Sequence, residues 1–233
     1  MRVHANRRAS VVYVSSTAFG IVLGILVGLR HAFEPDHLTA VSTLVSESHS
    51  PRQGVLLGAL WGLGHTISLV VVGVLLAVIG ATLPARIGVA FELCVAAMLL
   101  LLGARAIVIA MRAPESMHAH LHAPFHVHGS IVSLRRDRRR WRPLAVGLVH
   151  GLAGSGALTA LVFAQLPTTA ARIIYMTLFG VGSMFGMAIA SGLAGAALQF
   201  AARSASIRQK IGLATGILSI VVGLLWGIPL LIR

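Results

Sequence analysis

The chain has 233 residues, of which 57% are hydrophobic and 11% are charged, with a formal net charge of +13. Its mean hydropathy is +0.89. Because a soluble domain carries about a quarter charged residues, this composition indicates a membrane protein. The basic excess is typical of loops that face anionic lipid, and we expect no nucleic-acid partner. The single cysteine, Cys94, excludes a membrane thiol–disulfide carrier, which needs a cysteine pair.

Apolar runs of roughly 20 residues are long enough to cross the bilayer core as helices, and six such runs are present. We therefore predict an all-α polytopic membrane protein, since a backbone in lipid must satisfy its own hydrogen bonds. The first run is too long for one crossing at a rise of about 1.5 Å per residue, so it should break near Pro35. The predicted spans are 12–45, 54–79, 87–111, 144–166, 173–200 and 211–232.

The first run contains a concentration of ionisable residues, GLRHAFEPDHLTAV at 28–41. An ionisable group at membrane depth is costly unless it is paired, hydrated or bound to a ligand, so these residues are candidates for a functional site. Imidazole and carboxylate groups are ligands of divalent first-row metals. The motif therefore indicates a metal site or a proton relay.

Helix geometry sharpens this interpretation. On a regular helix the side chains of Glu34 and His37 lie near the face of His31, whereas Asp36 points well away from His37. Pro35 has no N–H and clashes with the carbonyl of the residue four positions before it. We expect the proline to unwind this turn, free that carbonyl and redirect Asp36, although a simple packing kink is the alternative.

A second candidate ligand, His65, lies deep in the second predicted span, in the segment LWGLGHTISLV at 60–70. Gly62 and Gly64 flank it and would let a neighbouring backbone come close. A lone buried histidine is usually a hydrogen-bonded core residue, but an adjacent helix rich in histidine and carboxylate favours a ligand here.

The segment between the third and fourth spans differs in composition from the rest of the chain. It contains MHAHLHAPFHVHG at 117–129 and RRDRRRWR at 135–142, so it should form a polar loop. Clustered histidines are typical of a weak metal store or sensor, and a plain polar linker is the alternative. The five histidines are His118, His120, His122, His126 and His128.

An internal repeat divides the chain. GLRH, LTAV and LWGLG in the first part recur as GLVH, LTAL and LFGVG in the second, all offset by about 120 residues. We predict two three-helix halves, 1–111 and 144–233, joined by the loop 112–143. An odd number of crossings gives the halves opposite orientations, as in transporters whose substrate site lies at the repeat interface. His150 is equivalent to His31, but its half lacks the acids, which makes His150 a further candidate ligand of an asymmetric site.

RHAFEPDH contains His-x4-Asp-His, formed by His31, Asp36 and His37, and resembles the signature of the nickel/cobalt transporter family. LGHTISLVV, with His65, is similar to the second signature of that family. The chain most resembles the short urease-accessory-type membrane proteins, in its Glu-Pro before Asp-His and in GLVHGLAGSGALTAL and FGVGSMFGMAIASG. The later acidic signatures of the larger permeases are absent from this sequence.

The resemblance implies a permease that binds Ni²⁺ or Co²⁺ as its substrate and moves it across the membrane, with uptake as the main expectation. His31, Asp36, His37 and His65 would bind the ion, and Glu34 would tune the charge. We expect neither enzymatic activity nor an organic cofactor. The alternatives are an exporter whose His-rich loop is a sensor, a non-transporting accessory protein that hands nickel to a metalloenzyme maturation protein, and a proton-coupled carrier of another substrate.

Loop charges predict the orientation. With six spans, the loops on the side of the His-rich segment hold eleven Lys and Arg residues, against six on the opposite side. Because basic loops stay on the cytoplasmic side, we expect the His-rich loop inside the cell and both termini outside. The predicted location is the bacterial cytoplasmic membrane.

Overall fold

The computed structural model describes residues 22–45, 50–81, 83–112, 141–153, 166, 168–201 and 205–232. Every regular element in this part of the chain is a helix. Four of the helices are long and apolar enough to cross a membrane, which confirms the prediction of an all-α polytopic membrane protein. They are α3 (Pro51–Ile79), α4 (Ala85–Arg112), α6 (Thr169–Ala201) and α7 (Ala205–Ile232).

The first and fourth predicted spans are represented by shorter helices. Val22–His31 is an apolar helix, residues 32–34 form a turn, and α2 (Pro35–Val45) follows. A further helix covers residues 141–153. Because 12–21 and 154–165 lie outside the described residues, complete crossings by these two spans stay a prediction.

The predicted break at Pro35 is present, but its backbone differs in one respect. Pro35 is the first residue of α2, where a missing N–H costs nothing. The carbonyl of His31 accepts a hydrogen bond from the Glu34 N–H at 3.0 Å. The expectation that this carbonyl would be free was therefore wrong, because a tight turn replaces the lost helical bond. The break does place Asp36 in the first turn of α2, where a helix N-terminus favours negative charge.

The helix α3 has a clear signal at each end. Ser50 caps its start in an extended conformation and accepts a hydrogen bond from the Gln53 N–H at 3.3 Å. Gly80 ends it with φ 64°, and its N–H bonds the carbonyl of Leu76. A Cβ at Gly80 would meet nothing within 4 Å, so the left-handed conformation explains the glycine. These caps fix the length of the helix that carries His65.

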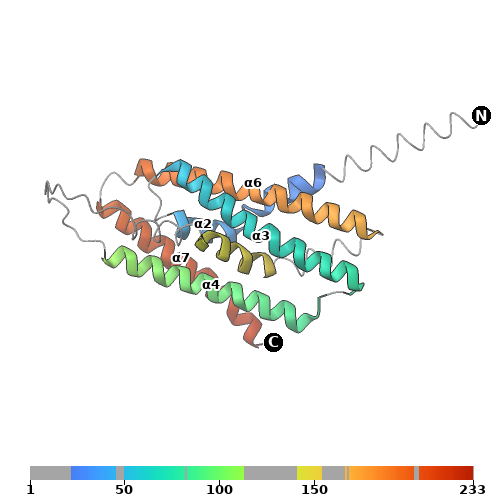
Figure 1. The fold of residues 1–233 in the computed structure, drawn as a ribbon. Coiled ribbons are helices and arrows are strands. Elements are labelled where there is room, and N and C mark those ends of the chain that lie inside the picture. Colours follow the sequence, from blue (N-terminus) through green and yellow to red (C-terminus); the bar gives the residue numbers. More distant parts are fainter. Residues whose placement is uncertain are drawn as a thin grey trace, which may run out of the picture.

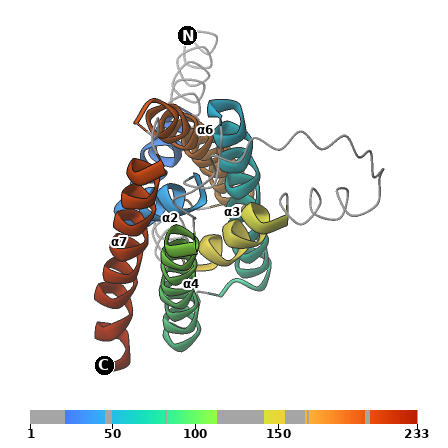
Figure 2. The same ribbon diagram turned by 90° about the vertical axis from the view of Figure 1, so that its left-hand side faces the viewer.

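The long helices form two pairs, with α2 between them (Figures 1 and 2). α3 packs along α6, α4 packs along α7, and α2 contacts all four. Contacts along the first pair run in opposite directions, because Gly54 lies against Ser191 whereas Gly73 lies against Met176. Each pair joins the corresponding helices of the two proposed halves, and such helices are antiparallel when a repeat is inverted.

Contacts of the short helices also match between the halves. A Cβ at Gly28 would meet the carbonyl of Phe179 in α6, and one at the equivalent Gly147 would meet the carbonyl of Trp61 in α3. Trp61 and Phe179 are themselves equivalent in the LWGLG and LFGVG segments. Each short helix therefore packs on a long helix of the other half. The boundaries 1–111, 112–143 and 144–233 stay a prediction, because 113–140 lies outside the described residues.

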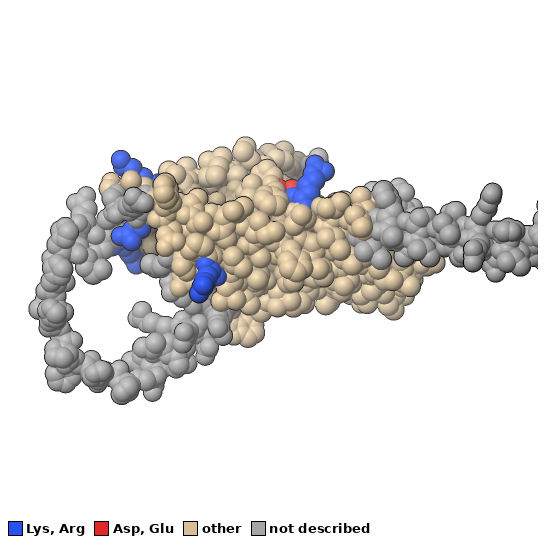
Figure 3. Space-filling view, turned by 90° about the horizontal axis from the view of Figure 1, so that it is seen from above, with Lys and Arg blue, Asp and Glu red and all other residues tan. Residues whose placement is uncertain are grey.

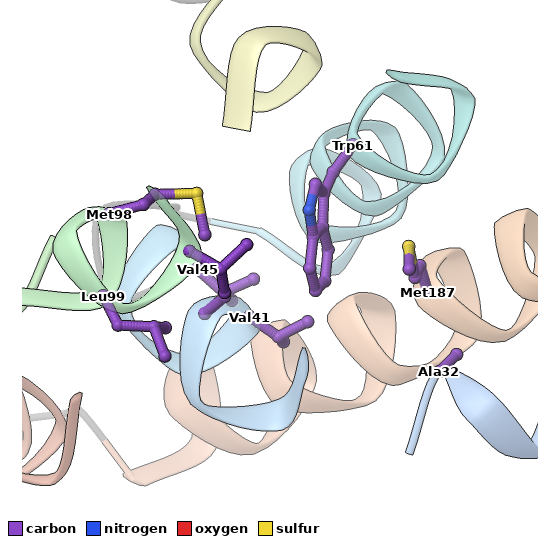
Figure 4. Packing of buried hydrophobic residues seen from close by; sticks show 9 residues of the cluster. Ala32, Val41, Val45, Trp61, Met98, Leu99 and Met187 are labelled. Carbon is purple, nitrogen blue, oxygen red and sulfur yellow. The ribbon is translucent and has the colours of Figure 1, made fainter. Parts of the chain in front are cut away.

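The buried core surrounds α2 and leaves an apolar exterior. Val41 and Val45 of α2 lie between α4, with Met98 and Leu99, and Trp61 of α3 (Figure 4). The face in Figure 3 is largely uncharged, with Lys and Arg side chains in a few groups and very little acid. Exposed large aliphatic side chains occur on every long helix, as expected for surfaces that face lipid.

Candidate metal centre

Four histidines that are far apart in the sequence meet beside α2. His31 ends the first short helix, His37 lies in the first turn of α2, His65 lies in α3 and His150 lies in the helix 141–153. Ring centroids are 4.4 Å apart for His31 and His37, 5.4 Å for His31 and His65, and 4.2 Å for His37 and His150. His37, His65 and His150 are at most 2% exposed. The structure thus brings residues of both proposed halves into one buried cluster.

The cluster lies near the middle of the long helices. His65 is 14 residues from Pro51 and 14 from Ile79, the two ends of α3. At about 1.5 Å per residue, this places it roughly 21 Å from either end. A helix of this composition would therefore hold His65 deep in the bilayer, where an unpaired polar group is most costly.

Glycines allow the helices that carry the histidines to approach. A Cβ at Gly151 would meet the carbonyl of His65, and a Cβ at Gly147 would come within 2.9 Å of the His65 N–H nitrogen. At Gly64 a Cβ would meet the carbonyl of Leu144. The helix 141–153 therefore packs backbone against backbone on α3. This contact brings His150 beside His65 and next to α2.

Asp36 links two of the histidines. Its carboxylate accepts a hydrogen bond from His37 Nδ1 at 3.0 Å and another from His150 Nε2 at 2.9 Å. Its side chain is 10% exposed, so water screens these contacts little. Glu34 makes the corresponding contact at the rim, with Oε2 3.0 Å from His31 Nδ1, but its side chain is 52% exposed. The motif thus contains one buried and one exposed carboxylate–histidine pair.

Several buried nitrogens of the cluster have no hydrogen-bond partner among the described residues. They are His31 Nε2, His37 Nε2, both ring nitrogens of His65, His150 Nδ1 and Trp61 Nε1. Leaving such a group unsatisfied costs about 1–3 kcal/mol, so a cluster of them calls for a common partner. Neutral imidazole nitrogens that converge suit a transition-metal ion, and these residues fit one.

Two overlapping groups could hold an ion. In each of them, one ligand atom per residue lies within 4.8 Å of the others. The first contains His31, His37 and His65, and the second contains Asp36, His37 and His150. Five of the six ligands proposed in the helices belong to these groups. The sixth, Glu34, contacts His31.

Two aromatic walls of the site were missed by sequence reasoning. The Trp61 ring lies 5.6 Å from His37 and 5.7 Å from His150, and the Phe179 ring lies 5.2 Å from His31. The signal for them was the LWGLG and LFGVG repeat, in which they are equivalent. The proposed loop ligands lie outside the described residues and stay a prediction: His118, His120, His122, His126 and His128.

Comparison with known proteins places the chain among its relatives. It is 30% identical over 208 residues to the urease accessory protein UreH of Bacillus sp. (strain TB-90), covering 88% of each chain. The chain belongs to the UreH family. This family membership and the helical fold together confirm a membrane protein of the urease-accessory type.

More distant relatives of this UreH-family chain occur in a plant. The chain is 28% and 27% identical to the Arabidopsis thaliana chloroplast proteins FOR GROWTH AND FERTILITY 1 and 2, and both matches cover 70% of the chain. The chain spans less than half of these two proteins, 46% and 44%. No protein-family model matches it, and no solved structure matches it.

Proposed function

We propose that this protein is a permease that moves Ni²⁺ or Co²⁺ across the bacterial cytoplasmic membrane, with uptake as its main direction. The observation that carries the proposal is the buried histidine cluster, in which each histidine has at least one nitrogen without a hydrogen-bond partner among the described residues. An ion would satisfy several of them at once. Imidazole ligands favour nickel, cobalt and zinc over magnesium and calcium.

The same geometry argues against a proton relay as the main role. A relay needs donors and acceptors in hydrogen-bond contact along its path. Among the described candidate residues, such contacts join only His37, Asp36 and His150 to one another and His31 to Glu34. His31 and His65 have rings 5.4 Å apart, and neither nitrogen of His65 bonds any described residue. Converging lone pairs repel one another unless a cation lies between them, so bound metal explains this cluster better than a moving proton.

Nickel accumulation in cells tests the proposal. Cells that produce the wild type should accumulate radioactive nickel above the vector level, and His37→Ala should return them to it. Thr177→Ala is a matched control, because its exposed hydroxyl donates only to the Ile173 carbonyl of its own helix. Equal accumulation by the wild type and His37→Ala, at equal protein levels, would contradict the proposal. A wild type that lowers cell nickel would instead reverse the direction to export.

A non-transporting role in metalloenzyme maturation is the second candidate, and it is favoured by the similarity to UreH, a urease accessory protein. Vesicles that contain only the purified protein separate the two. A permease should carry Ni²⁺ or Co²⁺ to an indicator dye trapped inside them. An accessory protein should give no flux there, yet change urease activation in cells when it is deleted.

A further inference from the structure

Each carboxylate oxygen of Asp36 already accepts a hydrogen bond in the structure. One of its oxygens contacts His37 and the other contacts His150, at 3.0 and 2.9 Å. An ionised carboxylate only accepts hydrogen bonds, so the two imidazoles must donate. The proton of His37 therefore lies on Nδ1, and its Nε2 carries a free lone pair. The proton that faces Asp36 from His150 lies on Nε2.

His31 repeats this arrangement at the rim. Its Nδ1 faces Glu34 at 3.0 Å, which leaves Nε2 buried and without a partner among the described residues. His65 completes the group, since both of its nitrogens lack such a partner. A carboxylate that holds the far nitrogen of a metal-binding histidine fixes the ring and its tautomer. His31 and His37 both have this form.

We propose a division of roles within the cluster, which rests on the proposed metal transport. His31, His37 and His65 are the ligands of the ion. Asp36 and Glu34 are positioning residues that orient two of these imidazoles. His150, contributed by the other half of the chain, is a positioning residue that acts on the ion only through Asp36.

The competing group, Asp36 with His37 and His150, explains less of the structure. An ion there would leave His31 Nε2 and both nitrogens of His65 buried without partners in the described chain. It would also compete with the two short hydrogen bonds that Asp36 already makes. The three-histidine group satisfies one nitrogen of each of its members and preserves both bonds.

The proposed roles also explain the sequence difference between the halves. The segment after His150 needs no acid, because His150 uses the acid of the first half. Ser183, the equivalent of His65 in LFGVGS, has a hydroxyl with no partner among the described residues and no imidazole. The second half thus contributes one positioning residue, His150, and the first half contributes the ligands.

Counting the imidazoles on bound cobalt tests the assignment. The full-length protein is purified without a histidine tag, with the five loop histidines replaced by glutamine so that they add no ligands. It is loaded with less than one equivalent of Co²⁺ and studied by X-ray absorption spectroscopy. The wild-type site should show three imidazoles, and His65→Gln should show two. His150→Gln should keep three, because its side-chain amide can still donate to Asp36.

Affinity measured by calorimetry gives the second readout. His150→Ala should keep three imidazoles but bind Co²⁺ about 10- to 100-fold more weakly, the usual effect of losing a partner behind a ligand. His150→Gln should recover most of that loss. Zn²⁺ should compete with Co²⁺, and Mg²⁺ should not.

Four imidazoles in the wild type, with one lost in His150→Gln, would overturn the assignment while leaving metal binding intact. The wild-type count decides this even if a variant fails to fold. Absence of bound cobalt in the wild type would overturn the proposed function and the assignment together.

Discussion

The helix that ends at His31 and the helix that carries His150 pack alike and differ in chemistry. Each presses a glycine, Gly28 or Gly147, against the backbone of a long helix of the other half. After His31 the chain continues with Glu34 and Asp36, whereas the segment after His150 has no acid before the next long helix. A shared packing frame can therefore hold an ion-binding site whose ligands come chiefly from one half.

The long helices α3 and α6 show the same contrast. Trp61 and Phe179 occupy equivalent positions and each contacts a histidine ring. One turn further, His65 in α3 is matched by Ser183 in α6, and both are fully buried. The aromatic wall is common to the two helices, and the imidazole is present in one.

The largest effect should follow from disrupting the glycine contacts by which each short helix packs on a long helix. Gly28→Val and Gly147→Val each place a branched side chain against backbone that cannot move, and overpacking costs about 1–3 kcal/mol or more. Both variants should unfold at a lower temperature than the wild type. Fluorescence-detected size-exclusion chromatography of heated samples measures this. Gly88→Val is the control, because its Cβ would meet only Leu83 at 3.7 Å. A stable Gly147→Val beside an unstable Gly28→Val would show that the frame is not shared.

Much of this fold was predictable because its signals are local. The apolar length of α3, α4, α6 and α7 indicates membrane helices, and Pro35 marks the break in the first span. The role of Asp36 was not predictable from helix geometry. One of its two partners is His37, the next residue of α2, and the other is His150, which lies 114 residues away in another helix. Only the tertiary contact of the helix 141–153 with α3 brings His150 within reach.

The next largest effect should follow from making α3 resemble α6. His65→Ser replaces a proposed ligand with the residue found at the equivalent position. Losing a residue that only supports a ligand lowers activity roughly 10- to 100-fold. Because a ligand contributes more than its supporting residue, nickel uptake should fall by at least that much. Ser183→Ala should leave uptake unchanged, because it removes only an unpartnered hydroxyl. Radioactive uptake at matched protein levels measures both, and full uptake by His65→Ser would exclude it as a ligand.

The smallest effect should come from two serines that hydrogen-bond between helices. Ser68 donates to the Leu148 carbonyl at 2.6 Å, and Ser219 donates to the Leu99 carbonyl at 2.8 Å. Replacing either with alanine should lower stability by about 0.6–1 kcal/mol, because the acceptor carbonyl lies in a helix and keeps its backbone bond. Thermal unfolding in detergent should give similar shifts for the two variants.

Their effects on metal binding should differ even so. Ser68 lies three residues after His65, and Leu148 lies two residues before His150. This hydrogen bond therefore helps to fix the position of His150 relative to His65. Ser68→Ala should weaken Co²⁺ binding by less than the roughly 10-fold expected for a direct partner. Ser219 joins α7 to α4, and neither helix carries a residue of the histidine cluster. Ser219→Ala should therefore leave Co²⁺ binding unchanged. Equal cobalt affinities in the two variants would mean that the ligands are held by the backbone packing of Gly147 and Gly151 alone.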